Sequence, residues 1–231
     1  MDYKKATEGD FSLYGINNHS KEIVRTRKRI GAVVETPSIY LDMSAEDNLK
    51  QQYRILGIPS YSTIPDLLKL VGLENTGKKK ARNFSLGMRQ RLGIAIALSG
   101  SPDFLILDEP INGLDPQGII EIRELILKLN HEHDITVLIS SHILDELSRI
   151  ATHFGFIDKG QMIQEISALE LNTKCRKCVK LTVSNMEVLC NVLTEKGYDY
   201  SVISDKENRC ICQIRYNITC CRTGKKRMQC S

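Results

Sequence analysis

Two short apolar segments, FLIL (104–107) and ITVLIS (135–140), constrain the fold of this chain most strongly. Each is a nearly continuous apolar run and lacks the regular polar alternation of a strand with one face in water. Such runs are typical of strands buried on both faces, which occur mainly in parallel sheets covered by helices. The sequence therefore predicts an α/β fold built on a parallel sheet, with ligands bound beyond the carboxyl ends of the strands.

Helical patterns alternate with these strands. The segment at 118–130 places four apolar residues on one helical face: Ile119, Ile122, Ile126 and Leu129. The segment at 45–57 has acidic residues early and a glycine at its end, as helices commonly do. The other predicted elements are a strand at 29–35, helices at 64–73 and 143–151, and a hairpin at 154–166 that turns around Asp158, Lys159 and Gly160.

The composition of the chain changes near residue 172. Residues 173–231 hold 12 Lys and Arg against 5 Asp and Glu, together with all eight cysteines. We therefore predict a first domain over 1–172 and a small cysteine-rich region over 173–231, with strands at 179–184 and 209–216 and a helix at 185–197. A zinc site at Cys175, Cys178, Cys210 and Cys212 is an open alternative to free thiols, although the spacing is poor and this region has no histidine.

Charge and hydropathy exclude two classes of function. The net charge of +4 is too small to indicate a nucleic-acid partner. No segment approaches the roughly 18 consecutive apolar residues of a membrane span, and the polar N-terminus does not resemble a secretory signal.

Polar residues gather where the predicted strands end and where a helix begins. Asp108 and Glu109 follow the strand at 104–107, and His142 follows the strand at 135–140. A carboxylate at such an edge can reach a metal through water, and the next can orient a water for attack on a phosphate. Ser85 and Gly87 open a helix whose free N–H groups suit a phosphate. Taken singly, the Asp108-Glu109 pair fits a solvated acidic pair equally well, whereas an isolated Ser-x-Gly is more often a plain helix cap and a lone histidine is more often structural.

The order and spacing of these residues resemble the ATP-binding cassette (ABC) family. Ser85-Leu86-Gly87-Met88 matches its signature motif, Asp108-Glu109 its Walker B motif with the catalytic glutamate, Asn112-Gly113-Leu114-Asp115 its D-loop, and His142 its switch histidine. The resemblance covers roughly residues 8–170. It implies a P-loop NTPase-like parallel sheet with a helical subdomain at about 44–100 and a small C-terminal α+β appendage.

The resemblance also implies roles for these residues. Glu109 and His142 are the expected catalytic residues, and Mg²⁺ is expected to be held by Asp108 and Glu35. Glu35 lies where the family has its Q-loop glutamine, so an oxygen ligand is kept and a negative charge is added. Contacts to ATP are expected from Ser85, Gly87, Arg89, Gln90, Asp115 and Glu35. The combination of Glu35-Thr36-Pro37 with Ser85-Leu86-Gly87-Met88 resembles the branch that exports bacitracin and lantibiotics and protects against such antimicrobial peptides.

A phosphate-binding loop of the form G-x-x-x-x-G-K-[ST] is expected in this family and is not found here. The one near-match, Gly72 to Lys79, ends in a lysine in place of the Ser or Thr that binds Mg²⁺. It also follows a helical pattern, and its Gly77 lies only eight residues before Ser85, whereas the P-loop of this family lies far upstream of the signature motif. We therefore expect that the printed chain starts after the P-loop unit and that alone it does not hydrolyse ATP.

The resemblance implies an ATP-binding subunit of an exporter, at the cytoplasmic face of the cell membrane. Its expected partners are a second nucleotide-binding subunit and separate integral membrane permease subunits. One alternative is a non-enzymatic remnant or regulatory fragment without a P-loop. A soluble ABC ATPase without a transport role ranks lower, because such proteins usually hold two cassettes or long insertions.

Overall fold

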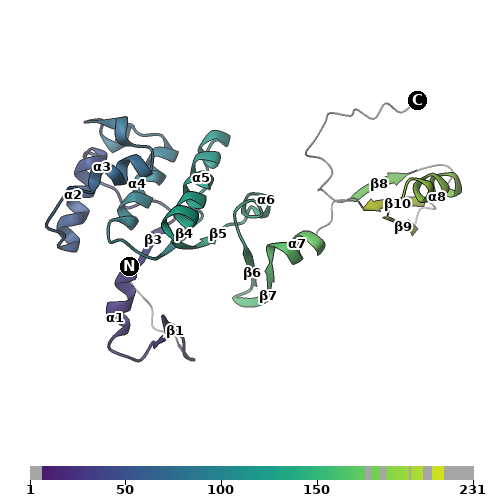
Figure 1. Cartoon of the computed structure of the whole chain (residues 1–231), viewed down its shortest axis with the longest axis horizontal. Helices are drawn as coiled ribbons and strands as arrows, with labels where there is room; N and C mark the ends of the chain where they lie inside the picture. Colours follow the sequence, from purple (N-terminus) through teal and green to yellow (C-terminus); the bar gives the residue numbers. More distant parts are fainter. Residues whose placement is uncertain (1–6, 175–177, 183–185, 198, 205–209, 216–231) are drawn as a thin grey trace. The chain divides into compact units, whose positions relative to one another are not determined.

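The computed structural model describes residues 7–174, 178–182, 186–197, 199–204 and 210–215 (Figure 1). Contacts within the chain divide it into two units, Met1–Ile150 and Ala151–Ser231. The predicted boundary at residue 172 was based on composition, whereas this division places the hairpin that follows residue 150 in the second unit. The boundary at 172 stays a prediction.

A parallel three-stranded sheet forms the centre of the first unit. It consists of β3 (Ile30–Val34), β4 (Phe104–Asp108) and β5 (Thr136–Ser140), in the order β3-β4-β5 (Figure 1). The register pairs Val34 with Asp108 and Asp108 with Ser140, so the three strands end level with one another. The α/β prediction and its three strands are confirmed.

One face of this sheet is buried and the other is not. The last helix before β4 is α4 (Leu86–Leu98), and the helix between β4 and β5 is α5 (Pro116–His133). Because the strand order advances in one direction, right-handed crossovers bring both helices to the same face. Leu105 and Leu107 on that face are fully buried.

The prediction that β5 is buried on both faces is wrong. Leu138 is 54% exposed and Val34 on β3 is 46% exposed, both on the face opposite α4 and α5. No described helix covers that face, and an apolar run cannot reveal which of its two faces will be covered.

Three helices pack beside the sheet and form the region predicted as a helical subdomain. In α2 (Ala45–Leu56), Ser44 caps the N-terminus by accepting a hydrogen bond from the Asp47 N–H, and Gly57 ends the helix in the left-handed conformation. The next helix, α3 (Ile64–Leu70), is three residues shorter than predicted because Gly72, at φ +66°, breaks it. Two 3₁₀ turns, η2 (Glu74–Thr76) and η3 (Ala81–Asn83), lead into α4.

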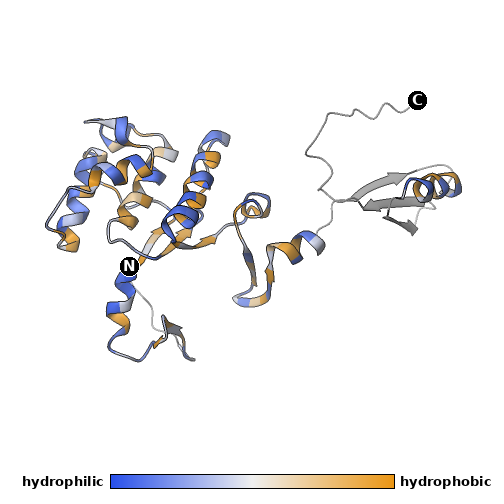
Figure 2. Cartoon of the chain, in the orientation of Figure 1, coloured by the Kyte–Doolittle hydropathy of each residue, from blue (hydrophilic) through white to orange (hydrophobic). Residues whose placement is uncertain are grey.

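The hydrophobic core lies between the helices α2, α3, α4 and α5 and the covered face of the sheet. Its largest fully buried side chains include Leu49, Ile64, Leu73, Leu92, Ile94, Leu105, Leu107, Ile122 and Leu129. Figure 2 shows α5 with one apolar and one polar side, as its sequence pattern predicts. Two partly buried ion pairs, Arg91–Glu121 and Arg123–Glu146, tie α5 to α4 and to the short α6 (Leu144–Leu147).

An N-terminal segment approaches the opposite, amino end of the sheet. It contains β1 (Ser12–Leu13), β2 (Ile16–Asn17), α1 (Ile23–Thr26) and η1 (Arg27–Arg29). The Tyr14 hydroxyl donates a hydrogen bond to Asp103, the residue before β4, and the Arg29 guanidinium forms an ion pair with the same carboxylate. This guanidinium also lies 3.8 Å from the centre of the Tyr14 ring.

The second unit begins with the predicted hairpin, β6 (His153–Asp158) and β7 (Gln161–Ser167), which turns at Lys159 and Gly160, both at positive φ. After α7 (Ala168–Lys174) come β8 (Cys178–Thr182), α8 (Met186–Glu195), β9 (Asp199–Ser204) and β10 (Cys210–Arg215). The three strands form an antiparallel sheet in the order β8-β10-β9, so the predicted strand–helix–strand order is present with one strand added. Cys175, part of the possible zinc site, lies outside the described residues.

Among the described residues, no helix combines the length and the apolar character that crossing a membrane requires.

Candidate functional site

The carboxyl edge of the central sheet brings together side chains from segments far apart in the sequence. Asp108 ends β4 and Ser140 ends β5, side by side in register. Glu35 and Glu109 immediately follow the paired residues Val34 and Asp108, and both adopt φ +48°. Non-glycine residues rarely adopt positive φ, and such positions concentrate at functional sites.

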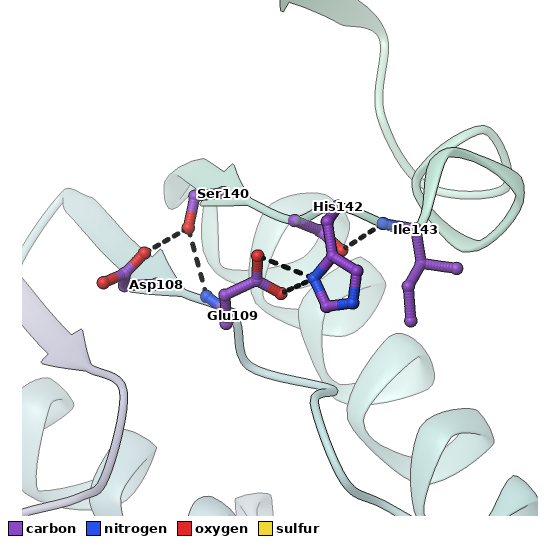
Figure 3. Close-up of polar contacts among 6 residues, drawn as sticks. Asp108, Glu109, Ser140, His142 and Ile143 are labelled. Carbon is purple, nitrogen blue, oxygen red and sulfur yellow. Dashed lines mark hydrogen bonds and ion pairs between the residues drawn. The ribbon is translucent and has the colours of Figure 1, made fainter.

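One serine hydroxyl connects the two acidic residues of β4 (Figure 3). Ser140 Oγ donates a hydrogen bond to Asp108 Oδ1 and accepts one from the Glu109 N–H at 3.1 Å. The Glu109 N–H is also 3.1 Å from the Ser140 carbonyl oxygen. Sequence reasoning missed Ser140. The sequence did contain a signal for it: if the two predicted strands are aligned in parallel so that their carboxyl ends are level, Ser140 lies beside Asp108.

Glu109 and His142 are in direct contact. His142 Nδ1 lies 3.0 Å from each carboxylate oxygen of Glu109, and it donates to the carboxylate in the tautomer that carries a proton on Nδ1 (Figure 3). The Glu109 side chain is 26% exposed and that of His142 is 65% exposed. A carboxylate oriented by an imidazole and still reachable by water has the geometry of a general base.

The start of α4 presents the matched signature residues. Ser85 caps the helix by accepting a hydrogen bond from the Met88 N–H at 3.2 Å, and both Ser85 and Leu86 are exposed. Gly87 is buried, and a Cβ built on it would lie 3.8 Å from the Cα of Gly118. The helix therefore begins against the N-terminal turn of α5, and its free N–H end is open to an anion.

Three other predicted contact residues lie near this helix start. The Arg89 guanidinium donates to the carbonyl oxygens of Ala81 and Arg82, so it braces the turn before α4. Gln90 is buried and its Nε2 has no hydrogen-bond partner. Asp115 is the N-cap residue of α5 and is exposed. Contacts from these three residues to ATP stay predictions.

The oxygen donors at the sheet edge fit a magnesium ion. Mg²⁺ is usually held by one or two carboxylates, with waters and substrate phosphates filling the remaining positions. Asp108 and Glu35 are such carboxylates at the ends of adjacent strands. The described residues contain no cluster of three or more His, Cys, Asp or Glu side chains that could hold a metal ion.

The segment Gly72–Lys79 does not have the structure of a phosphate-binding loop. It follows α3 rather than a strand and includes the 3₁₀ turn η2. Gly72 and Gly77 both have positive φ, and Lys78 and Lys79 are exposed. Its interpretation as a helix end followed by a solvated basic turn is confirmed.

Comparison with known proteins identifies close relatives. A sequence model described as ABC transporter matches residues 2–112. The chain is 43% identical over 197 residues to the bacitracin transport ATP-binding protein BcrA of Bacillus licheniformis, covering 84% of this chain and 63% of that protein. It is 51% identical over 141 residues to the lantibiotic transport ATP-binding protein SrtF of Streptococcus pyogenes, covering 61% of each.

A third relative is matched over more of its length. It is YcbN of Bacillus subtilis (strain 168), an uncharacterised ABC transporter ATP-binding protein, 38% identical over 207 residues that cover 89% of this chain and 67% of YcbN. The chain thus spans between 61% and 67% of the length of these three relatives.

Solved structures with the same fold are ATP-binding cassettes. The dimeric post-hydrolysis state of the cassette MJ0796, bound to ADP and Pi, matches with a TM-score of 0.61 at 24% identity, covering 71% of this chain and 75% of that one. The cassette cbiO1 of Clostridium perfringens matches with a TM-score of 0.62 at 24% identity, covering 78% and 70%. These matches confirm the predicted P-loop NTPase-like α/β fold.

Proposed function

This chain belongs to the ABC transporter family of ATP-binding proteins, and from that premise we propose that it forms the ATP-binding part of an exporter. It couples ATP binding and hydrolysis at a dimer interface to transport by separate membrane subunits. The named functions of the bacitracin and lantibiotic relatives favour antimicrobial peptides as the exported class. In such an exporter the chain acts at the cytoplasmic face of the membrane.

The contact between Glu109 and His142 is the observation that carries this proposal. Hydrolysis needs a base that orients a water toward the terminal phosphate of ATP, and Glu109 fits that role, with both carboxylate oxygens 3.0 Å from His142 Nδ1. His142 Nε2, at the far side of the ring, is then available to a phosphate oxygen. Asp108 and Glu35 would hold Mg²⁺, which neutralises phosphate charge when bound.

The exposed start of α4 supports a second subunit as partner. Ser85 and Gly87 lie at the start of α4, whereas Glu109 lies at the carboxyl end of β4. In the proposed dimer, Ser85 contacts the ATP held by the opposite subunit, and Glu109 acts on the ATP of its own. Asp115, exposed at the start of α5, would line the same interface.

A second candidate function rests on one specific observation: the described residues include no segment with the sequence and structure of a P-loop. Asp108 and Glu109 without a cationic phosphate-binding loop repel an anionic ligand. As the second candidate we propose a regulatory or non-enzymatic role, in which these residues dock as a cassette without turning over ATP.

A phosphate-release assay on two proteins separates these candidates. The printed chain alone should release no phosphate above background, whereas a fusion behind the P-loop-bearing strand–loop–helix of an ABC cassette should hydrolyse Mg-ATP. Asp108→Ala in the fusion is the matched control and should abolish that activity. Phosphate release by the printed chain that Asp108→Ala removes would reveal a substitute phosphate loop, and Gly72–Lys79 would be the first segment to test. A folded fusion that binds ATP without hydrolysing it would overturn the catalytic assignment.

A further inference from the structure

Two adjacent serines at the end of β5 make different contacts. Ser140 Oγ reaches back across the sheet to both Asp108 and the Glu109 N–H. Ser141 Oγ instead accepts a hydrogen bond from the Ile143 N–H at 3.1 Å, at the entry to α6. The sheet register accounts for the difference, because Ser140 is paired with Asp108 and parallel partners point to the same face.

The Ser140 hydroxyl is a hydrogen-bond donor and a hydrogen-bond acceptor at the same time. Its single proton goes to an Asp108 carboxylate oxygen, and a lone pair receives the Glu109 N–H. The first bond restricts the rotation of the Asp108 carboxylate. The second helps to hold the Glu109 backbone at φ +48°, a conformation that a glutamate adopts only when its surroundings impose it.

We propose that Ser140 is a positioning residue that aligns the two acidic residues of the site with each other. This inference rests on the proposed ATPase function for its catalytic consequence. By holding the Glu109 backbone, Ser140 directs the Glu109 side chain toward His142. By holding the Asp108 carboxylate, Ser140 keeps it at the carboxyl edge of the sheet, next to Glu109. In this role Ser140 acts through Asp108 and Glu109 and takes no part in the chemical step itself.

Three variants separate positioning from a general structural role. Ser140→Ala removes the hydroxyl, Ser140→Thr keeps it on a residue suited to a strand, and Ser141→Ala removes the neighbouring hydroxyl, which does not contact Asp108 or Glu109. Ser140 is exposed, so removing its hydroxyl leaves no buried cavity. All three variants should therefore unfold at the same denaturant concentration as the parent chain.

The first readout needs no nucleotide. The Glu109 N–H keeps its bond to the Ser140 carbonyl oxygen in every variant, so the test is whether the hydroxyl adds to the protection that this bond gives. In the printed chain, amide hydrogen exchange resolved by NMR should be faster at Glu109 in Ser140→Ala, by about twofold or more, and restored in Ser140→Thr. Ser141→Ala should change exchange at Ile143 and leave Glu109 unchanged. If the exchange rate of the Glu109 amide is unchanged in a folded Ser140→Ala variant, the proposal is overturned, whatever the activity of the fusion protein.

The second readout uses the active fusion described above. Ser140→Ala should lower kcat by about tenfold with KM for ATP within about twofold, because a lost bond to a charged group is worth about that factor and substrate binding is left in place. Ser140→Thr should recover most of kcat. An equal loss in Ser141→Ala, or a rise in KM with kcat unchanged, overturns the positioning role. A fusion that is inactive with Ser140 intact overturns the proposed function instead, and the exchange result then stands alone.

Discussion

Gly93 on α4 lies so close to Pro37 that a Cβ built on it would be 2.4 Å from the proline Cβ. Pro37 belongs to the loop that leaves β3 directly after Glu35. Because Gly93 has no side chain, this loop can pack directly against α4. The position of Glu35 and the packing of α4 are linked through this contact.

We expect Gly93→Ala to lower the free energy of unfolding. Alanine gains about 1 kcal/mol over glycine in a helix, whereas overpacking a close contact costs about 1–3 kcal/mol, and at 2.4 Å the clash prevails. The matched control is Gly100→Ala, because a Cβ there would lie 3.9 Å from Leu56 Cδ1, an ordinary contact. Urea unfolding followed by circular dichroism measures both. A Gly93→Ala variant at least as stable as Gly100→Ala would show that the loop moves aside freely.

Glu109→Gln should abolish turnover in the fusion protein while ATP binding persists. The amide still reaches His142 but cannot take a proton from water, and removing a general base lowers the rate by at least about 100-fold. Single-turnover hydrolysis and equilibrium binding of ATP are measured on the same preparation. Near-normal hydrolysis would remove Glu109 from its assigned role.

Ser85→Arg should block turnover of the ATP held by the opposite subunit. It places bulk and a positive charge at the exposed start of α4 and removes the cap hydrogen bond to the Met88 N–H. Mixed dimers with one altered subunit test this, with a P-loop lysine variant marking which subunit holds the ATP. Loss of activity only at the altered subunit's own site contradicts the assignment across the interface.

The contact of Tyr14 and Arg29 with Asp103 should depend on pH. The hydrogen bond from Tyr14, followed by the one from Arg29, lowers the pKa of Asp103 in the folded chain. Its stabilising effect is therefore present above the unfolded pKa and is lost as pH falls through the lowered folded value. Desolvation, followed by the Asp103 hydrogen bond, raises the pKa of Tyr14, so its effect is lost as pH rises through that raised value.

Attachment of the β1–β2 segment should thus be constant around neutral pH and weaken at both extremes. The NMR signals of the Tyr14 ring followed from acid to alkali measure it. Asp103→Asn should remove the acid limb, and added salt should weaken the contact because Arg29 and Asp103 are 53% and 42% exposed. An acid limb that persists in Asp103→Asn assigns the transition to another group.

The elements that sequence patterns predicted well are those whose signals are local. The two signals that predicted α2 are both present in the structure, because Glu46 and Asp47 lie in its first turn and Gly57 is its C-cap. The four-residue apolar face of α5 is packed in the core as predicted. The predicted family is confirmed by the match to YcbN, and two other relatives carry bacitracin and lantibiotic transport in their names.

What the sequence did not reveal depends on contacts between segments. The exposure of Leu138 follows from both crossovers using one face of the sheet, which no single strand encodes. The role of Ser140 follows from its register with Asp108, and sliding β5 by one residue would have presented Ser141 instead. The helix predicted at 143–151 is only Leu144–Leu147, and a turn over residues 148–150 follows it.

The uncovered face and the outer edge of β5 have a practical consequence for anyone who purifies this chain. In the described part of the chain β5 pairs only with β4, so one row of its N–H and C=O groups has no strand partner, next to an exposed Leu138. Such an edge recruits strands from other molecules. Association of the purified chain should therefore become faster as the protein concentration rises, and dilute solutions should stay monodisperse longest.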